Sequence, residues 1–262
     1  SNWVGNLRIL IGAAYYFSND FDTVSMTFQF INYNLFPRKK KSEDDQLVVG
    51  TNENSSNNAL SISSKEDRNI VNKVFTRPPS RNDALVWQVR TLIDTAEFAE
   101  AAGLINTLRN DPLFPERLYP YFQEVQGYWF FQQQMYDSAI NYIKNAMPNS
   151  IDMADKARRE YLLAQLYEMN KHQDTASDYY DKAIKHTTDP LMDIYANLNK
   201  AKMLKTNDPA GIDKAISILL RMARKDKYEP YRDIVYYSAA ELAMEKPDTA
   251  NAIVYYKKST HY

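Results

Sequence analysis

The chain has 262 residues, 44% of them hydrophobic, and its 32 basic and 33 acidic side chains leave a net charge of −1. A nucleic-acid-binding protein normally carries a basic excess, so this balance argues against that class of partner. The absence of cysteine excludes disulfides and thiolate metal sites, and no apolar run approaches the roughly 18 residues that a membrane-spanning helix needs. A chain of this length is expected to form several domains or an elongated array.

Residues 1–37 have the pattern of one helical hairpin. Gly12 and Tyr15 lie three residues apart and Val24 and Phe28 lie four apart, so each pair falls on one helix face. The small Gly12 suits a close approach of two helices, and Tyr15 is the expected aromatic residue of the same face. The pattern ends near Pro37, where we expect the first hairpin to finish.

Residues 38–81 interrupt this pattern. They are rich in serine, asparagine and charge, and such a composition buries too little apolar area to offset the entropy lost on ordering. We predict a polar insert over 38–81. Two interpretations stay open, because inserts in repeat proteins sometimes form loops on a binding face and sometimes are solvated excursions.

From residue 82 to the end, one alanine recurs at intervals of 37 to 39 residues. It stands at Ala101, Ala139, Ala176, Ala215 and Ala252, with a large residue four positions later in each unit. A small or slim residue stands twelve positions earlier in four units, at Val89, Gly127, Ala164 and Ala240. A period of this size with this order of small and large residues is typical of tetratricopeptide arrays.

The expected fold is therefore all-α, a tetratricopeptide-like solenoid. Five hairpins over 82–262 and the one over 1–37 make about six, wound as a right-handed superhelix. Because helical patterns run to both ends, we expect the chain to be part of a longer protein.

The residues that carry catalysis or bind metals are sparse. His172, His186 and His261 have no metal-ligand spacing and no neighbouring acidic group in a catalytic order, and no phosphate-binding loop or nucleophile motif is present. His172 is expected in an interhelix turn, exposed to solvent. The sequence predicts a protein that is not an enzyme and that holds no cofactor or metal.

A tetratricopeptide array offers a concave groove lined by the first helix of each hairpin. Tyrosine and arginine, two residue types that carry binding energy at interfaces, are frequent at the positions expected to face inward. The alternative is that Tyr121, Tyr128 and Tyr161 pack between adjacent repeats. The predicted groove residues are Arg90, Asp94, Tyr121, Glu124, Tyr128, Arg158, Tyr161, Gln165, Glu168, Tyr237 and Glu241.

Several segments go beyond what a tetratricopeptide consensus dictates. They read FQFINYNLFPRKKK, ALVWQVRTLID, NDPLFPERLYPYFQEVQGYWFFQQQMYDSA, KARREYLLAQLYE, HTTDPLMDIYANLN and KDKYEPYRDIVYYSAAEL. As an ordered set, which leaves out only roughly residues 42–69, they resemble the SprE/PorW family, the tetratricopeptide lipoproteins of Bacteroidetes gliding motility and type IX secretion.

This resemblance implies a non-enzymatic scaffold on the periplasmic face of the outer membrane. It would link the secretion translocon to the membrane-associated ring, its partners would be other proteins of that machinery, and its lipid anchor would lie outside this chain. Five residues match the family in the segment NDPLFPERLYP: Asp111, Pro112, Arg117, Tyr119 and Pro120. They are expected in an ordered connector between the second and third hairpins, with a partner contact as the alternative.

A different function also stays open, that of an outer-membrane tetratricopeptide lipoprotein that binds a glycan or a peptide. Trp3, Trp87 and Trp129 are the aromatic residues on which a sugar would stack. For Trp87 and Trp129, core packing is the alternative, because both fall inside helices of the repeat.

Overall fold

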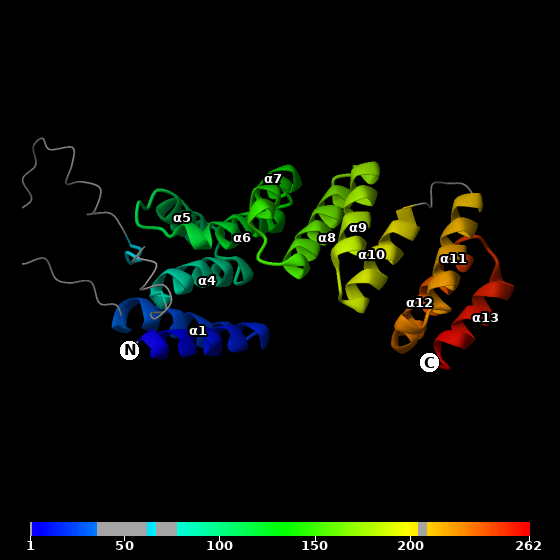
Figure 1. Cartoon of the computed structure of the whole chain (residues 1–262), viewed down its shortest axis with the longest axis horizontal. Helices are drawn as coiled ribbons and strands as arrows, with labels where there is room; N and C mark the ends of the chain where they lie inside the picture. The colour runs from blue at the N-terminus through cyan, green and yellow to red at the C-terminus, as the bar shows by residue number, and fades with distance from the viewer. Residues whose placement is uncertain (1, 36–61, 67–77, 204–208) are drawn as a thin grey trace, which may run out of the picture. The chain divides into compact units, whose positions relative to one another are not determined.

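A computed structural model describes residues 2–35, 62–66, 78–203 and 209–262. The elements in these ranges are helices, and no β-strand occurs among them (Figure 1). They pair as α1 (Asn2–Phe17) with α2 (Phe21–Phe30), α4 (Ser80–Asp94) with α5 (Phe98–Arg109), α6 (Tyr119–Gln132) with α7 (Tyr136–Ala146), α8 (Met153–Met169) with α9 (Gln173–His186), α10 (Pro190–Met203) with α11 (Pro209–Ala223), and α12 (Arg232–Glu245) with α13 (Thr249–Ser259). The described residues thus form the six hairpins that the repeat predicts.

The chain divides into two compact units, Ser1–Ala146 (unit 1) and Met147–Tyr262 (unit 2), with three hairpins each. Each unit has its own apolar core, which includes Phe28 and Phe122 in unit 1 and Tyr180 and Leu219 in unit 2. None of the described helices combines the length and the apolar character that a membrane span requires. The described residues also form four short elements: a π-helical turn η1 (Ile31–Leu35) and the 3₁₀ turns η3 (Glu116–Leu118), η4 (Met147–Asn149) and η5 (Asp226–Tyr231).

The recurring alanine marks the close contact inside each hairpin. Ala101, Ala139, Ala176, Ala215 and Ala252 are all completely buried. The glycines at the small position are equally constrained. A Cβ added to Gly12 would lie 2.6 Å from Cε1 of Phe28, and one added to Gly127 would lie 2.9 Å from Cδ1 of Ile143. The packing register predicted from the sequence is confirmed.

The aromatic position of the first hairpin was assigned to the wrong tyrosine. Tyr15 is 40% exposed, whereas Tyr16 is buried and packs edge-on against Phe21 and Trp87. Tyr16 lies on the face of α1 that α2 and α4 cover, whereas Tyr15, one residue earlier and about 100° away around the helix, points towards solvent. Figure 1 shows α1 beside these helices.

Four of the interhelix turns share one backbone feature. Asn19, Ala96, Gln134 and Lys171 each adopt a positive φ of 59° to 61° shortly before the second helix of the hairpin. Asparagine tolerates this conformation, but alanine, glutamine and lysine adopt it at a cost of about 1–2 kcal/mol. The packing of the two helices therefore dictates this turn.

The polar insert ends in structure earlier than predicted. Helix α4 begins at Ser80, two residues before the expected boundary, and Ile62 packs against buried apolar residues of unit 1. Ser63 is buried and Ile62 contacts the apolar core, so a solvated excursion is wrong for this stretch. The remainder of the predicted insert up to residue 77 lies outside the described residues.

Candidate protein-binding surface

Three of the predicted groove residues of unit 1 come together on α4 and α6. Arg90, Tyr121 and Glu124 line a cleft of about 320 Å³. Its other walls are Asp83, Val86, Trp87, Arg117, Leu118 and Val125. Tyr121 is 38% exposed, so its ring is accessible from solvent. A cleft with apolar walls and both signs of charge at its rim suits a protein segment of mixed polarity.

The other two predicted residues of unit 1, Asp94 and Tyr128, take part in a network that joins three helices. The Asp94 carboxylate accepts hydrogen bonds from the hydroxyls of Tyr16 on α1 and Tyr128 on α6. Arg90 Nε donates to the Tyr16 hydroxyl at 2.9 Å, and Gln132 Nε2 donates to that of Tyr128 at 2.6 Å. Burial, reinforced by the bond to Asp94, raises the pKa of Tyr128 to about 12. The network holds α1, α4 and α6 together behind the cleft.

In unit 2, two of the predicted residues of α8, Tyr161 and Glu168, contact side chains of the unit's own helices. Tyr161 contacts the ring of Tyr180 with centroids 5.6 Å apart, and Asn199 Nδ2 donates to both hydroxyls at 3.2 Å. The hydroxyl of Tyr180 donates to Glu168 at 2.6 Å. Burial first, and the bond to Glu168 second, raise the pKa of Tyr180 well above its usual range. Tyr161 therefore packs between repeats, as the alternative interpretation predicted.

The remaining predicted residues of unit 2 are half-buried or exposed. Arg158 pairs with Asp155 at 3.1 Å within α8, and Gln165 is half-buried on the same helix. On α12, Tyr237 is 52% exposed and its ring lies 5.7 Å from that of Tyr256, whose hydroxyl donates to Glu241. The role of these positions in binding a partner stays a prediction.

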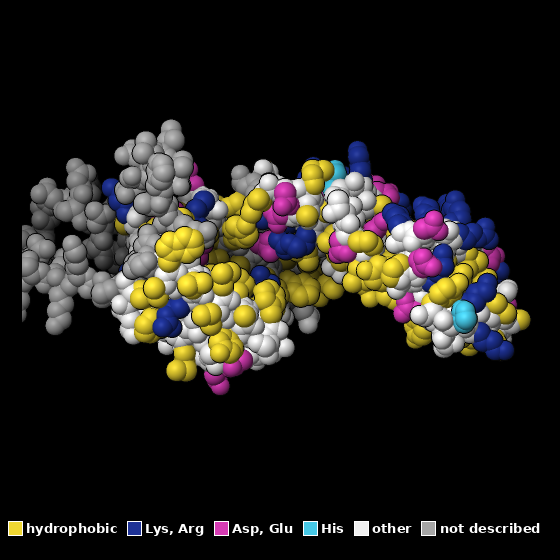
Figure 2. Space-filling model, turned by 60° about the horizontal axis from the view of Figure 1, so that its bottom comes forward, with side chains coloured by type: hydrophobic (Ala, Val, Ile, Leu, Met, Phe, Trp, Pro, Cys, Tyr) yellow, Lys and Arg dark blue, Asp and Glu magenta, His cyan; other side chains and the backbone are white. Residues whose placement is uncertain are grey.

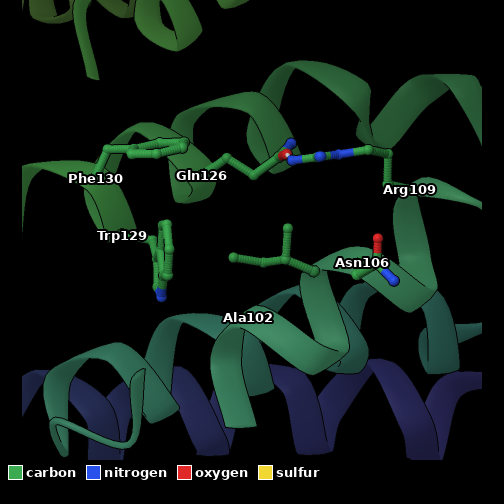
Figure 3. Close-up of a pocket in the computed structure, with 7 residues that line it drawn as sticks. Ala102, Asn106, Arg109, Gln126, Trp129 and Phe130 are labelled. Atoms are coloured by element: carbon green, nitrogen blue, oxygen red, sulfur yellow. Dashed lines mark hydrogen bonds between the residues drawn. The ribbon is translucent and has the colours of Figure 1, made fainter. Parts of the chain in front are cut away.

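A second cleft lies between α5 and α6, and sequence reasoning did not identify it (Figure 3). Its volume is about 200 Å³, and its residues are Ala102, Ile105, Asn106, Arg109, Gln126, Trp129 and Phe130. Arg109 Nη2 donates to Gln126 Oε1 at 2.7 Å and to the hydroxyl of Tyr142 at 3.0 Å. Trp129 Nε1 donates to the carbonyl of Phe98 at 3.1 Å. The polar groups at this cleft are thus engaged within the protein.

Hydrophobic side chains gather over the first hairpin, as Figure 2 shows. The exposed members of this surface are Trp3, Val4, Leu7, Leu10, Ile11, Phe17, Met26 and Tyr33. Single exposed apolar residues are common, but a group of them on one hairpin is a candidate interaction surface. Of these residues, only Trp3 was predicted from the sequence to contact a ligand.

The histidines occupy structural positions. His172 is exposed in the turn before α9, as predicted. His186 Nδ1 lies 2.6 Å from Oε2 of Glu160, a buried residue of α8, which sequence spacing did not reveal. Within the described residues, no three histidine or acidic side chains converge in a way that would hold a metal ion.

No family model and no curated protein sequence matches the chain. Among solved structures, the apo form of RapI is similar with a TM-score of 0.66 and 12% identity, over 98% of this chain and 64% of the RapI chain. BtubC (BKLC) from P. vanneervenii is similar with a TM-score of 0.53 and 12% identity, over 70% of this chain and 79% of that one. This chain thus spans less than two thirds of the length of RapI. Together with the six hairpins and their buried alanine register, these matches show a tetratricopeptide-like, all-α fold.

Proposed function

We propose that this chain is a protein-binding scaffold of the type IX secretion and gliding-motility machinery. In this role it links the outer-membrane translocon to the membrane-associated ring. It is held on the periplasmic face of the outer membrane by a lipid anchor outside this segment. The resemblance of six ordered segments to the SprE/PorW family supports this assignment, and the tetratricopeptide-like fold is compatible with it.

The observation that carries a protein-binding role is the cleft between α4 and α6. Arg90, Tyr121 and Glu124 were expected on a partner-facing surface, and they line one cleft together. Tyrosine and arginine at the wall of an apolar cleft are residues of the kind that dominate binding energy at interfaces. The nearly balanced net charge of −1 agrees with a protein partner and not with a polyanion.

Site-specific photo-crosslinking in cells tests this function. A photoreactive amino acid at Tyr121 or Glu124 is expected to capture components of the secretion or motility machinery, which mass spectrometry identifies. Glu100, exposed on α5 and outside the cleft, is the control position and should capture far less. Recovery of no such component from either cleft position would refute the proposal.

The alternative function, binding of a glycan, has less support. Trp129 and Phe130 do line a cleft, but its volume of about 200 Å³ lies below the roughly 300–1,000 Å³ of ordinary ligand pockets. Trp87 also lines the cleft between α4 and α6, but its ring stacks on Phe28 with centroids 6.0 Å apart, so part of it is covered by the core of unit 1. Saturable quenching of tryptophan fluorescence by a glycan would be evidence for this function.

A further inference from the structure

Residues 62–66 are held in unit 1 by a buried carboxylate. Oδ2 of Asp111, a residue only 6% exposed, accepts the backbone N–H of Ile62 at 2.9 Å and that of Ser63 at 2.8 Å. Its other oxygen, Oδ1, accepts the backbone N–H of Leu113 at 2.9 Å. The turn after α5 therefore fixes the carboxylate and directs one oxygen at the main chain of the segment.

A buried amide continues this pattern one residue further along. Asn82 of α4 is completely buried, its Oδ1 accepts the backbone N–H of Ser64 at 2.8 Å, and its Nδ2 donates to the carbonyl of Ser64 at 2.8 Å. Nδ2 also lies 3.0 Å from Oε1 of Glu66. Both bonds to Ser64 involve its main-chain N–H and carbonyl, so they do not require a particular side chain at this position.

Side chains at the two ends of the segment supply selectivity. Ile62 packs on the apolar core of unit 1. Glu66 accepts from Arg117 Nε at 2.9 Å and from Nη2 at 2.8 Å, while Asp83 holds the same guanidinium at 3.0 and 2.6 Å. Burial lowers the pKa of Arg117, but the bonds to Asp83 and Glu66 outweigh it and raise that pKa above its ordinary value. Lys65 is exposed.

We propose that Asn82, Asp111 and Arg117 form a peptide-recognition site, which residues 62–66 occupy from within the chain. The ligand class is a non-helical peptide with an apolar residue, two small residues, a variable residue and an acidic residue. Three main-chain N–H groups and one carbonyl of the segment pair with buried side chains. Such a division between backbone pairing and side-chain pockets is typical of peptide recognition. A buried amide and carboxylate left without these partners are costly, so the site favours an occupied state.

This site deepens the proposed scaffold function and rests on it. Asp83 and Arg117 also line the cleft between α4 and α6, so a peptide in the site has its acidic end beside that cleft. A segment tethered in the same chain has an effective concentration on the order of millimolar. A partner peptide must outcompete it, and residues 62–66 therefore set a threshold for binding.

The test measures binding of a fluorescent peptide, LSISSKEDR, to the full chain by polarisation. The sequence corresponds to residues 60–68. A variant in which residues 62–66 are replaced by a Gly/Ser stretch keeps the main-chain groups but lacks the side chains of Ile62 and Glu66. Because this stretch competes less well for the site, the variant is expected to bind the peptide at least tenfold more tightly than the unmodified chain. In that variant, Asp111→Asn or Arg117→Gln is expected to weaken binding at least tenfold, with helical circular dichroism unchanged.

Two matched peptides sharpen the result. A peptide with Glu66→Gln is expected to bind at least fivefold more weakly, because it loses the charge that pairs with Arg117. A peptide with Lys65→Gln is expected to bind as the original does, since Lys65 is exposed. Equal binding of the two peptides overturns the proposal. So does a lack of binding to the Gly/Ser variant when its circular dichroism is native.

Amide hydrogen exchange of the unmodified chain provides a second readout if the Gly/Ser variant does not fold. Slow exchange at Ile62, Ser63 and Ser64 that becomes at least tenfold faster in Glu66→Gln, but not in Lys65→Gln, supports the site. Unprotected amides in the unmodified chain overturn it. Peptide binding without cellular crosslinks from Tyr121 or Glu124 supports the site and contradicts the scaffold function. Crosslinks without peptide binding do the reverse.

Discussion

Units 1 and 2 share one fold but use their buried polar groups differently. In unit 2, Asp193 accepts from the hydroxyl of Tyr228 at 2.8 Å and from Lys227 Nζ at 2.6 Å, so α10 is fixed to η5 of the same unit. In unit 1, Asn82 and Asp111 pair with the main chain of residues 62–66 instead.

The two units differ in whether the group that pairs with the buried side chain can be replaced by another molecule. Side-chain pairs such as those of Asp193 join helices that cannot leave without unfolding the unit. Main-chain pairs to a short segment between helices can form with another peptide of similar shape. The two units have the same fold, but only the buried polar residues of unit 1 pair with a segment that a peptide could replace. This difference depends on a few buried polar residues and not on the fold.

The largest effect expected to separate the units comes from Ala176→Glu. Ala176 is completely buried on α9, so a carboxylate there should destabilise unit 2 by on the order of 3 kcal/mol. Because residues 62–66 belong to unit 1, the amides of Ile62 and Ser63 should keep their protection from hydrogen exchange. Chemical denaturation and hydrogen exchange together measure both outcomes.

Asp178→Glu is the matched control, because Asp178 is exposed on the same helix. It should change the free energy of unfolding by less than about 0.5 kcal/mol. Loss of protection at Ile62 and Ser63 in Ala176→Glu would contradict the description of unit 1 as a unit with its own core.

A smaller effect, confined to unit 1, is expected from Gly12→Ala. The new Cβ would stand 2.6 Å from the fully buried ring of Phe28, so the helices must separate at a cost of about 2 kcal/mol. Gly103→Ala is the control, since a Cβ there meets no atom within 4 Å. It should stabilise the helix by about 0.5–1 kcal/mol. Thermal unfolding of the two variants should shift in opposite directions, and a shared direction would disprove the close contact.

Sequence periodicity predicted the features of the fold that depend on local spacing along the chain. The alanine register and the six hairpins were predictable because close helix contacts require small residues at a fixed position in each unit. The positive φ at Ala96, Gln134 and Lys171 was not, because none of these residue types favours it and the helix packing dictates it.

The recognition of residues 62–66 was not predictable for a different reason. Asn82 and Asp111 lie 18 and 48 residues from their partners Ser64 and Ser63, and the segment reads only as polar composition. Asp94 and Tyr128 were expected to face a partner, since periodicity places them on the inner helices. Asp94 accepts from Tyr16, 78 residues away, and from Tyr128, and these bonds give both residues a structural role that no local pattern reveals.

The smallest effect concerns alkaline stability and tests that network in unit 1. The pKa of Tyr128 is raised from 10.0 to about 12, so between these values the folded state holds a proton that the unfolded state has lost. The contribution of Tyr128 is therefore complete below about pH 10 and falls as the pH rises towards 12. Solvent screens part of it, because the ring is only half-buried.

Tyr128→Phe should accordingly make the free energy of unfolding less steep between pH 10 and about 12. Tyr180, whose pKa is also raised by burial and by Glu168, remains in unit 2, so part of the alkaline loss should persist. Tyr33→Phe, on a ring that is 72% exposed, should leave the slope unchanged. Denaturation curves recorded across this pH range measure the slopes. Identical slopes for Tyr128→Phe and the unmodified chain would contradict a raised pKa of Tyr128 in the folded state.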